Sequence, residues 1–197
     1  MLSRNLSLYL IAILEGGALL SFEIMASRIY TPHLGSTIYV WTSILATTLI
    51  ALALSYRYSH RLIVKKSWKV VPIALTIAGS YVLFSTYGSS FLLESTYKMS
   101  IKSASLLIGI LLIFVPVFCL GLISPMLASL LAAEPSELGK QTGLVYGLST
   151  ISGVIFTLIS VFYLMPIIGV QSTLLCISLL LFCASLISYF KIQRNEF

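Results

Sequence analysis

The sequence predicts an all-α integral membrane protein, a bundle of six transmembrane helices in one domain over residues 1–197. Hydrophobic residues make up 58% of the chain and charged residues only 9%, and the mean hydropathy is +1.03. Such a composition lies well outside that of soluble domains. The polar intervals span roughly a dozen residues at most, too few for a separate soluble core. The fold must therefore form within the bilayer.

Windows of about 20 apolar residues, the length that crosses the hydrocarbon as a helix, define the six helices. They are predicted at residues 6–27, 37–57, 69–88, 104–132, 142–165 and 170–190. The turn-forming stretch T-P-H-L-G-S-T, residues 31–37, is expected to be the loop between the first two. The third helix follows a basic stretch at residues 57–69, which is expected to be a loop.

The fourth predicted helix contains Pro116, Gly121 and Pro125. A proline has no N–H to donate and its ring clashes with the carbonyl of the preceding turn, so we expect a kinked or locally unwound helix. Broken helices at membrane depth line ligand sites in transporters, whereas a plain kink has no such role. Both interpretations remain open.

The fifth predicted helix carries small residues at a regular spacing. Gly143 and Gly147 form a G-x-x-x-G pattern, and Ser149 with Gly153 repeats it. Such spacings let helices approach closely in membranes, so we expect this helix to pack against a neighbour or a second copy of the chain. Tyr146, Ser149 and Ser152 on the same helix could donate hydrogen bonds to Glu15 or a ligand, although membrane serines also bond their own backbone.

Positive charges divide unequally between the two sides of the six spans. With the N-terminus inside, three fall outside: Arg28, Lys98 and Lys102. The other nine fall inside: Arg4, Arg57, Arg61, Lys65, Lys66, Lys69, Lys140, Lys191 and Arg194. This bias predicts that both termini are cytoplasmic. The expected location is a plasma membrane of the bacterial inner-membrane type. We expect the basic stretch at residues 57–69 to act mainly as a topology signal. The alternative role is contact with an anionic lipid or a partner.

The first predicted helix holds charged residues that membrane spans rarely contain. The stretch E-G-G-A-L-L-S-F-E-I-M-A-S-R, residues 15–28, includes Glu15, Glu23 and Arg28. Glu15 lies about 13 Å from the inner edge, near the bilayer midplane, and Glu23 lies about 12 Å further along and about 80° around the helix. The two carboxylates therefore do not form a catalytic dyad. They either fasten the bundle through hydrogen bonds or form a cation or proton site.

The candidate ligand-binding residues are Glu15, Glu23, Arg28, Trp41, Tyr146 and Ser149. No catalytic residue is expected, because the sequence contains no serine–histidine–acid set, P-loop, H-E-x-x-H or dinucleotide fingerprint. Cys119, Cys176 and Cys183 lie in apolar segments without C-x-x-C spacing. We therefore expect no metal and no cofactor, and the absence of a basic face with interleaved aromatics argues against nucleic acid as a partner.

Three stretches resemble a known family in order along the chain. They are residues 22–45, which contain E-x-x-x-x-R, P-x-x-G-S and V-W-T-S; P-V-F-C-L-G-L-I-S-P, residues 116–125; and residues 143–153 followed by L-M-P-I-I-G-V, residues 164–170. These stretches resemble the membrane domain of the fused MFS/spermidine synthase family. The resemblance implies half of an MFS-type transporter, with a 3+3 inverted repeat as one arrangement, and a link to polyamines.

Two features depart from that family. Its members continue into a spermidine-synthase-like domain that this sequence lacks, so we expect no enzyme activity. The place of the family's G-G-x-x-A-D-type motif reads S-Y-R-Y-S-H-R-L, which weakens the expectation of an MFS gating loop.

We expect a transporter-like or ligand-binding subunit for a cationic small molecule such as a polyamine, using the intramembrane glutamates. The alternative is a non-transporting anchor or assembly subunit that recruits a spermidine-synthase-like enzyme or another membrane protein. In either case the partners are the lipid bilayer and a second chain, in a homo-oligomer or in a complex with another membrane or soluble protein.

Overall fold

The computed structural model describes residues 2–193 and is helical throughout, with no strand among these residues. Five stretches in this range are long and apolar enough to cross a membrane: Asn5–Leu34, Ile38–Val64, Val70–Ser95, Ile101–Leu131 and Pro135–Ile192. The elements are α1 (Leu2–Leu34), α2 (Ile38–Val64), α3 (Val70–Ser95), α4 (Ile101–Gly109), the π-helix η1 (Ile110–Phe114), α5 (Val115–Gly121), α6 (Ile123–Leu131), the 3-10 helix η2 (Pro135–Glu137), α7 (Leu138–Ile159), the π-helix η3 (Ser160–Leu164) and α8 (Met165–Gln193).

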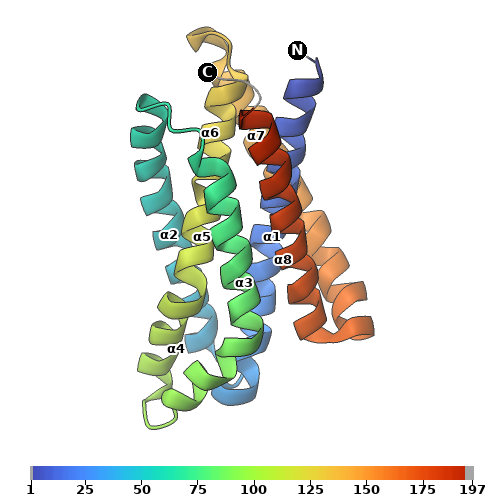
Figure 1. Ribbon diagram of the computed structural model, residues 1–197. Helices are drawn as coiled ribbons and strands as arrows, with labels where there is room; N and C mark the ends of the chain where they lie inside the picture. Colours follow the sequence, from blue (N-terminus) through green and yellow to red (C-terminus); the bar gives the residue numbers. More distant parts are fainter. Residues whose placement is uncertain (1, 194–197) are drawn as a thin grey trace.

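The last of the five stretches is too long for a single crossing. Its 58 residues would extend about 87 Å as one helix. Within α8, Gly169 has φ 81° and ψ 169°, so two helices meet across a kink at this residue. A positive φ suits glycine because it has no Cβ. Figure 1 shows the chain turning back between the orange and the red segments, so that α7 and most of α8 run in opposite directions.

The connections gather at the two ends of the bundle. The first and last described residues lie at one end, together with the α2–α3 and α6–α7 connections (Figure 1). The α1–α2 and α3–α4 connections lie at the other end. Lys65, Lys66 and Lys69 are therefore at the end of the termini, whereas Lys98 is at the opposite end. Arg194, which the charge count includes, lies outside the described residues.

Several helix boundaries differ from the sequence prediction. Helix α1 continues to Leu34, so Pro32 and His33 lie in its last turn instead of in a loop. Helix α2 continues to Val64, so most of the predicted basic loop is helical and only residues 65–69 connect α2 to α3. Hydropathy marks the part of a helix that lies in hydrocarbon, and a helix extends beyond it wherever its polar residues reach water.

Two π-helices interrupt the bundle, and each ends two residues before a proline. η1 precedes Pro116 and η3 precedes Pro166. In a π-helix each N–H bonds the carbonyl five residues earlier, so Pro116 leaves the Leu111 carbonyl without its backbone donor. The Tyr81 hydroxyl of α3 donates to this carbonyl at 2.7 Å.

The predicted break at Pro116, Gly121 and Pro125 therefore takes a milder form than unwinding. The helix widens over Ile110–Phe114 and is interrupted again at Leu122, between α5 and α6. The second widening, before Pro166, is a feature that the sequence analysis missed. It predicted one uninterrupted helix over residues 142–165.

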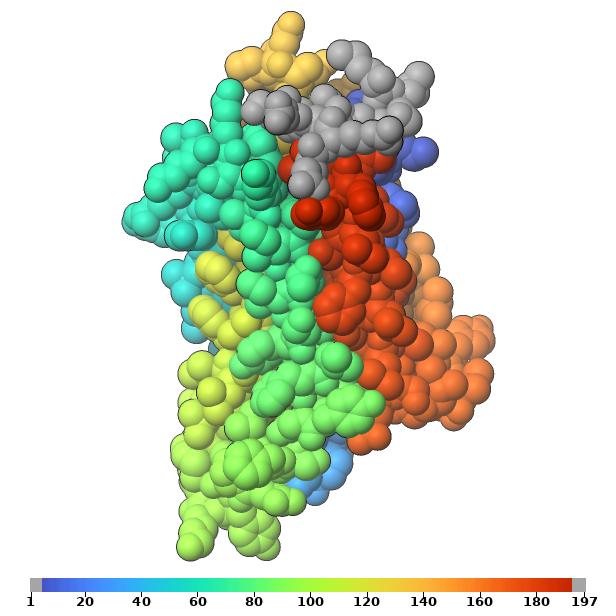
Figure 2. All heavy atoms as spheres, viewed as in Figure 1, coloured from blue at the N-terminus to red at the C-terminus, as the bar shows by residue number. Residues whose placement is uncertain are grey.

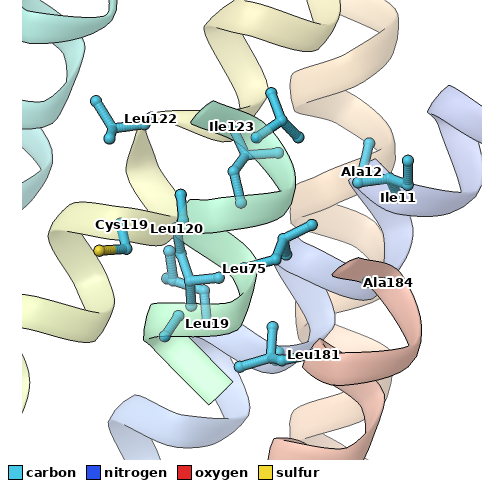
Figure 3. Packing of buried hydrophobic residues seen from close by; sticks show 14 of the residues in the cluster. Ile11, Ala12, Leu19, Leu75, Cys119, Leu120, Leu122, Ile123, Leu181 and Ala184 are labelled. Carbon is cyan, nitrogen blue, oxygen red and sulfur yellow. The ribbon is translucent and has the colours of Figure 1, made fainter. Parts of the chain in front are cut away.

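Buried apolar side chains from α1, α2, α3, α5, α6, α7 and α8 form the main core. In Figure 3, Leu19, Leu75, Leu120 and Leu181 converge between these helices. A second cluster joins α1, α2, α3, α4, η1 and α5 and contains the fully buried Tyr30, whose hydroxyl donates to the Ile108 carbonyl at 3.2 Å. The outer faces are also apolar, which suits helices that contact lipid on one side and each other on the other.

Tyr81→Phe should lower the free energy of unfolding by about 1 kcal/mol, because it removes the donor to the Leu111 carbonyl. Unfolding in mixed detergent micelles measures the change. Tyr87→Phe, at an exposed tyrosine of the same helix, is the matched control and should change little.

A double-mutant cycle with Pro116→Ala tests whether the Tyr81 hydroxyl replaces the N–H that the proline lacks. An alanine supplies the missing N–H, so Tyr81→Phe should cost less in that background. Equal costs in both backgrounds would contradict the assignment of this hydrogen bond to the proline.

Candidate functional site

The carboxylate of Glu15 lies inside the bundle, with 2% of the residue exposed. The Ser124 hydroxyl of α6 donates to its Oε2 at 3.0 Å, and the Ser149 hydroxyl of α7 donates to the same oxygen at 3.3 Å. Three helices therefore meet at one carboxylate oxygen. Two hydrogen bonds offset part of the cost of burying a polar group, but neither supplies a positive charge.

A cavity of about 200 Å³ adjoins this carboxylate between α1, α2, the α5–α6 junction and α7. Its walls are mainly apolar on α1 and α2 and polar on α6 and α7. The rings of Tyr56 and Tyr146 pack edge to face with centroids 6.1 Å apart. The lining residues are Glu15, Gly16, Leu19, Leu20, Leu52, Tyr56, Gly121, Ser124, Tyr146, Ser149 and Thr150. The lining thus contains one acid and no base.

Glycines allow the helices to approach closely enough to form this site. A Cβ at Gly16 would overlap the backbone carbonyl and the hydroxyl of Ser149, and a Cβ at Gly153 would overlap Leu20. Gly121 faces Ser55 of α2 in the same way. Small residues permit close approach of neighbouring helices, and glycine permits the closest because it has no Cβ. The small-residue spacing of Ser149 and Gly153 therefore serves the α1–α7 contact.

The other glycine pair of α7 has open space beside it in the described chain. A Cβ built at Gly143 or at Gly147 would meet no neighbouring side chain or helix within 4 Å. The helix itself packs against α1 through Ser149 and Gly153. A contact of Gly143 and Gly147 with a second copy of the chain stays a prediction.

The structure brings together three of the six predicted site residues, Glu15, Tyr146 and Ser149. Glu23 faces the interior with 9% exposed, but it lies outside the cavity lining and close to Thr48 of α2.

The remaining two predicted residues also lie outside the cavity lining. Arg28 is exposed, and Trp41 is 38% exposed near the start of α2. Both lie toward the end of the bundle opposite the termini.

The sequence analysis missed Tyr56, Ser124 and Thr150 as site residues. Tyr56 lies at the end of the predicted second helix, beside the basic stretch, where no periodic signal marks it. Ser124 precedes Pro125 in the interrupted helix, and this neighbouring break was the one local signal that pointed to it. Only the packing of α6 against α1 shows that Ser124 donates to Glu15.

A buried acid, hydroxyl groups and two aromatic rings in an apolar cavity suit an ammonium group. The carboxylate neutralises its charge, and tyrosine rings attract cations over their faces. No group of three or more histidine, cysteine, aspartate or glutamate side chains among the described residues is arranged to hold a metal.

Comparison of the chain with protein-family models, with curated proteins and with solved structures finds no match.

Gly16→Ala should lower the free energy of unfolding by about 1–3 kcal/mol, because a methyl group would press the α1 and α7 backbones apart. The same substitution at Gly143 should be neutral or should stabilise the protein by up to about 1 kcal/mol, since alanine favours the helix and meets open space. Unfolding of both variants in mixed micelles measures the difference. Equal losses at the two positions would contradict the α1–α7 contact.

Proposed function

We propose that the chain is a transporter-like membrane subunit whose Glu15 cavity binds the ammonium group of a small organic cation such as a polyamine. One observation carries the proposal: a carboxylate buried between three helices beside a cavity whose lining holds no basic residue. A buried ionised carboxylate without a counter-charge is costly. A cationic ligand supplies the charge that the chain does not.

The cavity also limits the size of the ligand. Its volume of about 200 Å³ is below the range of pockets that hold drug-sized molecules, so the ligand is a small amine or one end of a linear one. Tyr56 and Tyr146 provide aromatic faces beside the carboxylate. Leu19, Leu20 and Leu52 provide apolar contact for the methylene groups of an alkyl amine.

We place this site in a bundle that crosses the membrane six times, with both termini cytoplasmic. The turn at Gly169 divides the last apolar stretch into two crossings. The ends of the described chain share one end of the bundle with Lys65, Lys66 and Lys69 (Figure 1), in keeping with the positive-inside rule. In this arrangement the chain is half of an MFS-type transporter, and a second copy or a partner chain completes the pathway.

The resemblance to the membrane domain of the fused MFS/spermidine synthase family supports a polyamine as the cation. The motifs of that resemblance include the proline-bearing helix that supplies Gly121 and Ser124 to the cavity. They also include the helix that supplies Tyr146 and Ser149.

The second candidate function is a membrane anchor that organises another protein. The open face of α7 around Gly143 and Gly147 favours it, because close helix packing there requires a partner. In this case Glu15 serves only to fasten α1 to α6 and α7 through the two serine hydroxyls.

Binding and uptake of radiolabelled putrescine and spermidine by the purified protein in liposomes separate the two functions. Glu15→Gln should abolish saturable binding, because it removes the one charge in the cavity lining. Glu23→Gln is the matched control, a second buried glutamate of α1 outside that lining, and should retain binding. Folded wild-type protein that binds neither amine would contradict the transporter function and favour the anchor.

Tyr146→Leu should weaken amine binding by about 2- to 30-fold, in line with a cation–π contribution of about 0.5–2 kcal/mol. Tyr146→Phe keeps the ring and should retain most of the affinity. Equal losses in both variants would show that the hydroxyl, and not the aromatic face, contacts the ligand.

A further inference from the structure

A long groove runs between α3 and α8 on the outer face of the bundle, away from the Glu15 cavity. Its volume is about 680 Å³. In Figure 2 this face presents α3 in green beside α8 in red. The groove is lined by Lys69, Pro72, Ile73, Thr76, Ile77, Ser185, Leu186, Tyr189 and Ile192.

The polar groups in the groove bond to one another. The hydroxyls of Thr76 and Ser185 lie 2.7 Å apart, and each lies within hydrogen-bond distance of the Pro72 carbonyl, at 2.9 and 2.8 Å. Each hydroxyl has one proton, so the two protons are shared among these three contacts. They therefore have little need of a polar ligand. The exposed side chains of Ile73, Ile77 and Leu186 form the walls. The body of the groove suits an apolar chain.

One end of the groove is basic. Lys69 is the charged residue in its lining, and Lys65 and Lys66 precede it in the same short connection, which contains no acid. The first turn of α3 begins directly after Lys69, so the positive end of the helix dipole adds to the same field. This end favours an anion.

The length of the groove matches one leaflet of a membrane. It follows α3 from Lys69 to Ile77, about 12 Å at 1.5 Å per residue, and half of the hydrocarbon core is about 15 Å. A phospholipid has the same layout, with a charged headgroup above one leaflet's length of acyl chain. In the orientation proposed above, the basic end faces the cytoplasmic leaflet, where anionic lipids provide the negative charge.

We propose that the α3–α8 groove binds one anionic phospholipid, with its phosphate at Lys69 and an acyl chain along Ile73, Ile77 and Leu186. This site goes beyond the proposed function and shares no residue with the Glu15 cavity. Lipid binding at the groove can therefore be tested independently of amine binding.

Native mass spectrometry of the purified protein, with phosphatidylglycerol and phosphatidylcholine added in equal amounts, tests the proposal. The wild type should retain one phosphatidylglycerol in preference to phosphatidylcholine by at least fivefold. Lys69→Gln should lose this preference. Lys98→Gln, at an exposed lysine of the opposite end, is the matched control and should keep it.

Ile77→Trp fills the groove and should reduce retention of both lipids while leaving amine binding by the Glu15 cavity unchanged. Three results would overturn the proposal: equal retention of the two lipids by the wild type, unchanged preference in Lys69→Gln, or unchanged retention in Ile77→Trp. A dimer that Ile77→Trp dissociates would overturn it as well, because it would identify a second copy of the chain as the occupant.

Discussion

The contact between the Glu15 carboxylate and the hydroxyls of Ser124 and Ser149 determines how this bundle is assembled. A carboxyl group at membrane depth requires protein partners because hydrocarbon offers none. Its two donors come from α6 and α7, which lie more than 100 residues along the chain. Gly16, the next residue, lets the α7 backbone approach closely enough for Ser149 to reach the acid. One polar requirement thus specifies the positions of three helices whose apolar surfaces alone would allow many packings.

The prolines add a second constraint, which acts on the backbone. Pro116 and Pro166 each follow a π-helix at the same spacing, because a missing N–H and a bulky ring are accommodated by a wider turn. The widened turn η1 leads into α5 and α6, which supply Gly121 and Ser124 to the cavity. Tyr81 satisfies the carbonyl left free by Pro116, so the interruption costs little in a medium without water.

Sequence reasoning located the apolar stretches and the inward orientation of Glu15 and Glu23, because composition and burial of charge follow from the membrane itself. It did not find Ser124 or Tyr56, since their roles depend on helices that meet only in the folded bundle. It placed the end of α2 seven residues early, because hydropathy does not register a helix that continues into water. The Ser149–Gly153 spacing marks a contact with α1, whereas Gly143 and Gly147 face open space within one chain and their contact with a second copy stays a prediction. A spacing identifies a surface that permits close approach but not the helix that uses it.

Fastening and binding are not exclusive roles for Glu15. Both serine hydroxyls donate to Oε2 of the carboxylate, and an ionised carboxylate accepts hydrogen bonds through both of its oxygens. An ammonium group in the cavity can therefore bond to the same carboxylate without displacing either serine. Under the proposed function, ligand binding and the arrangement of α1, α6 and α7 are coupled only to the extent that the bound cation strengthens or weakens the two serine contacts.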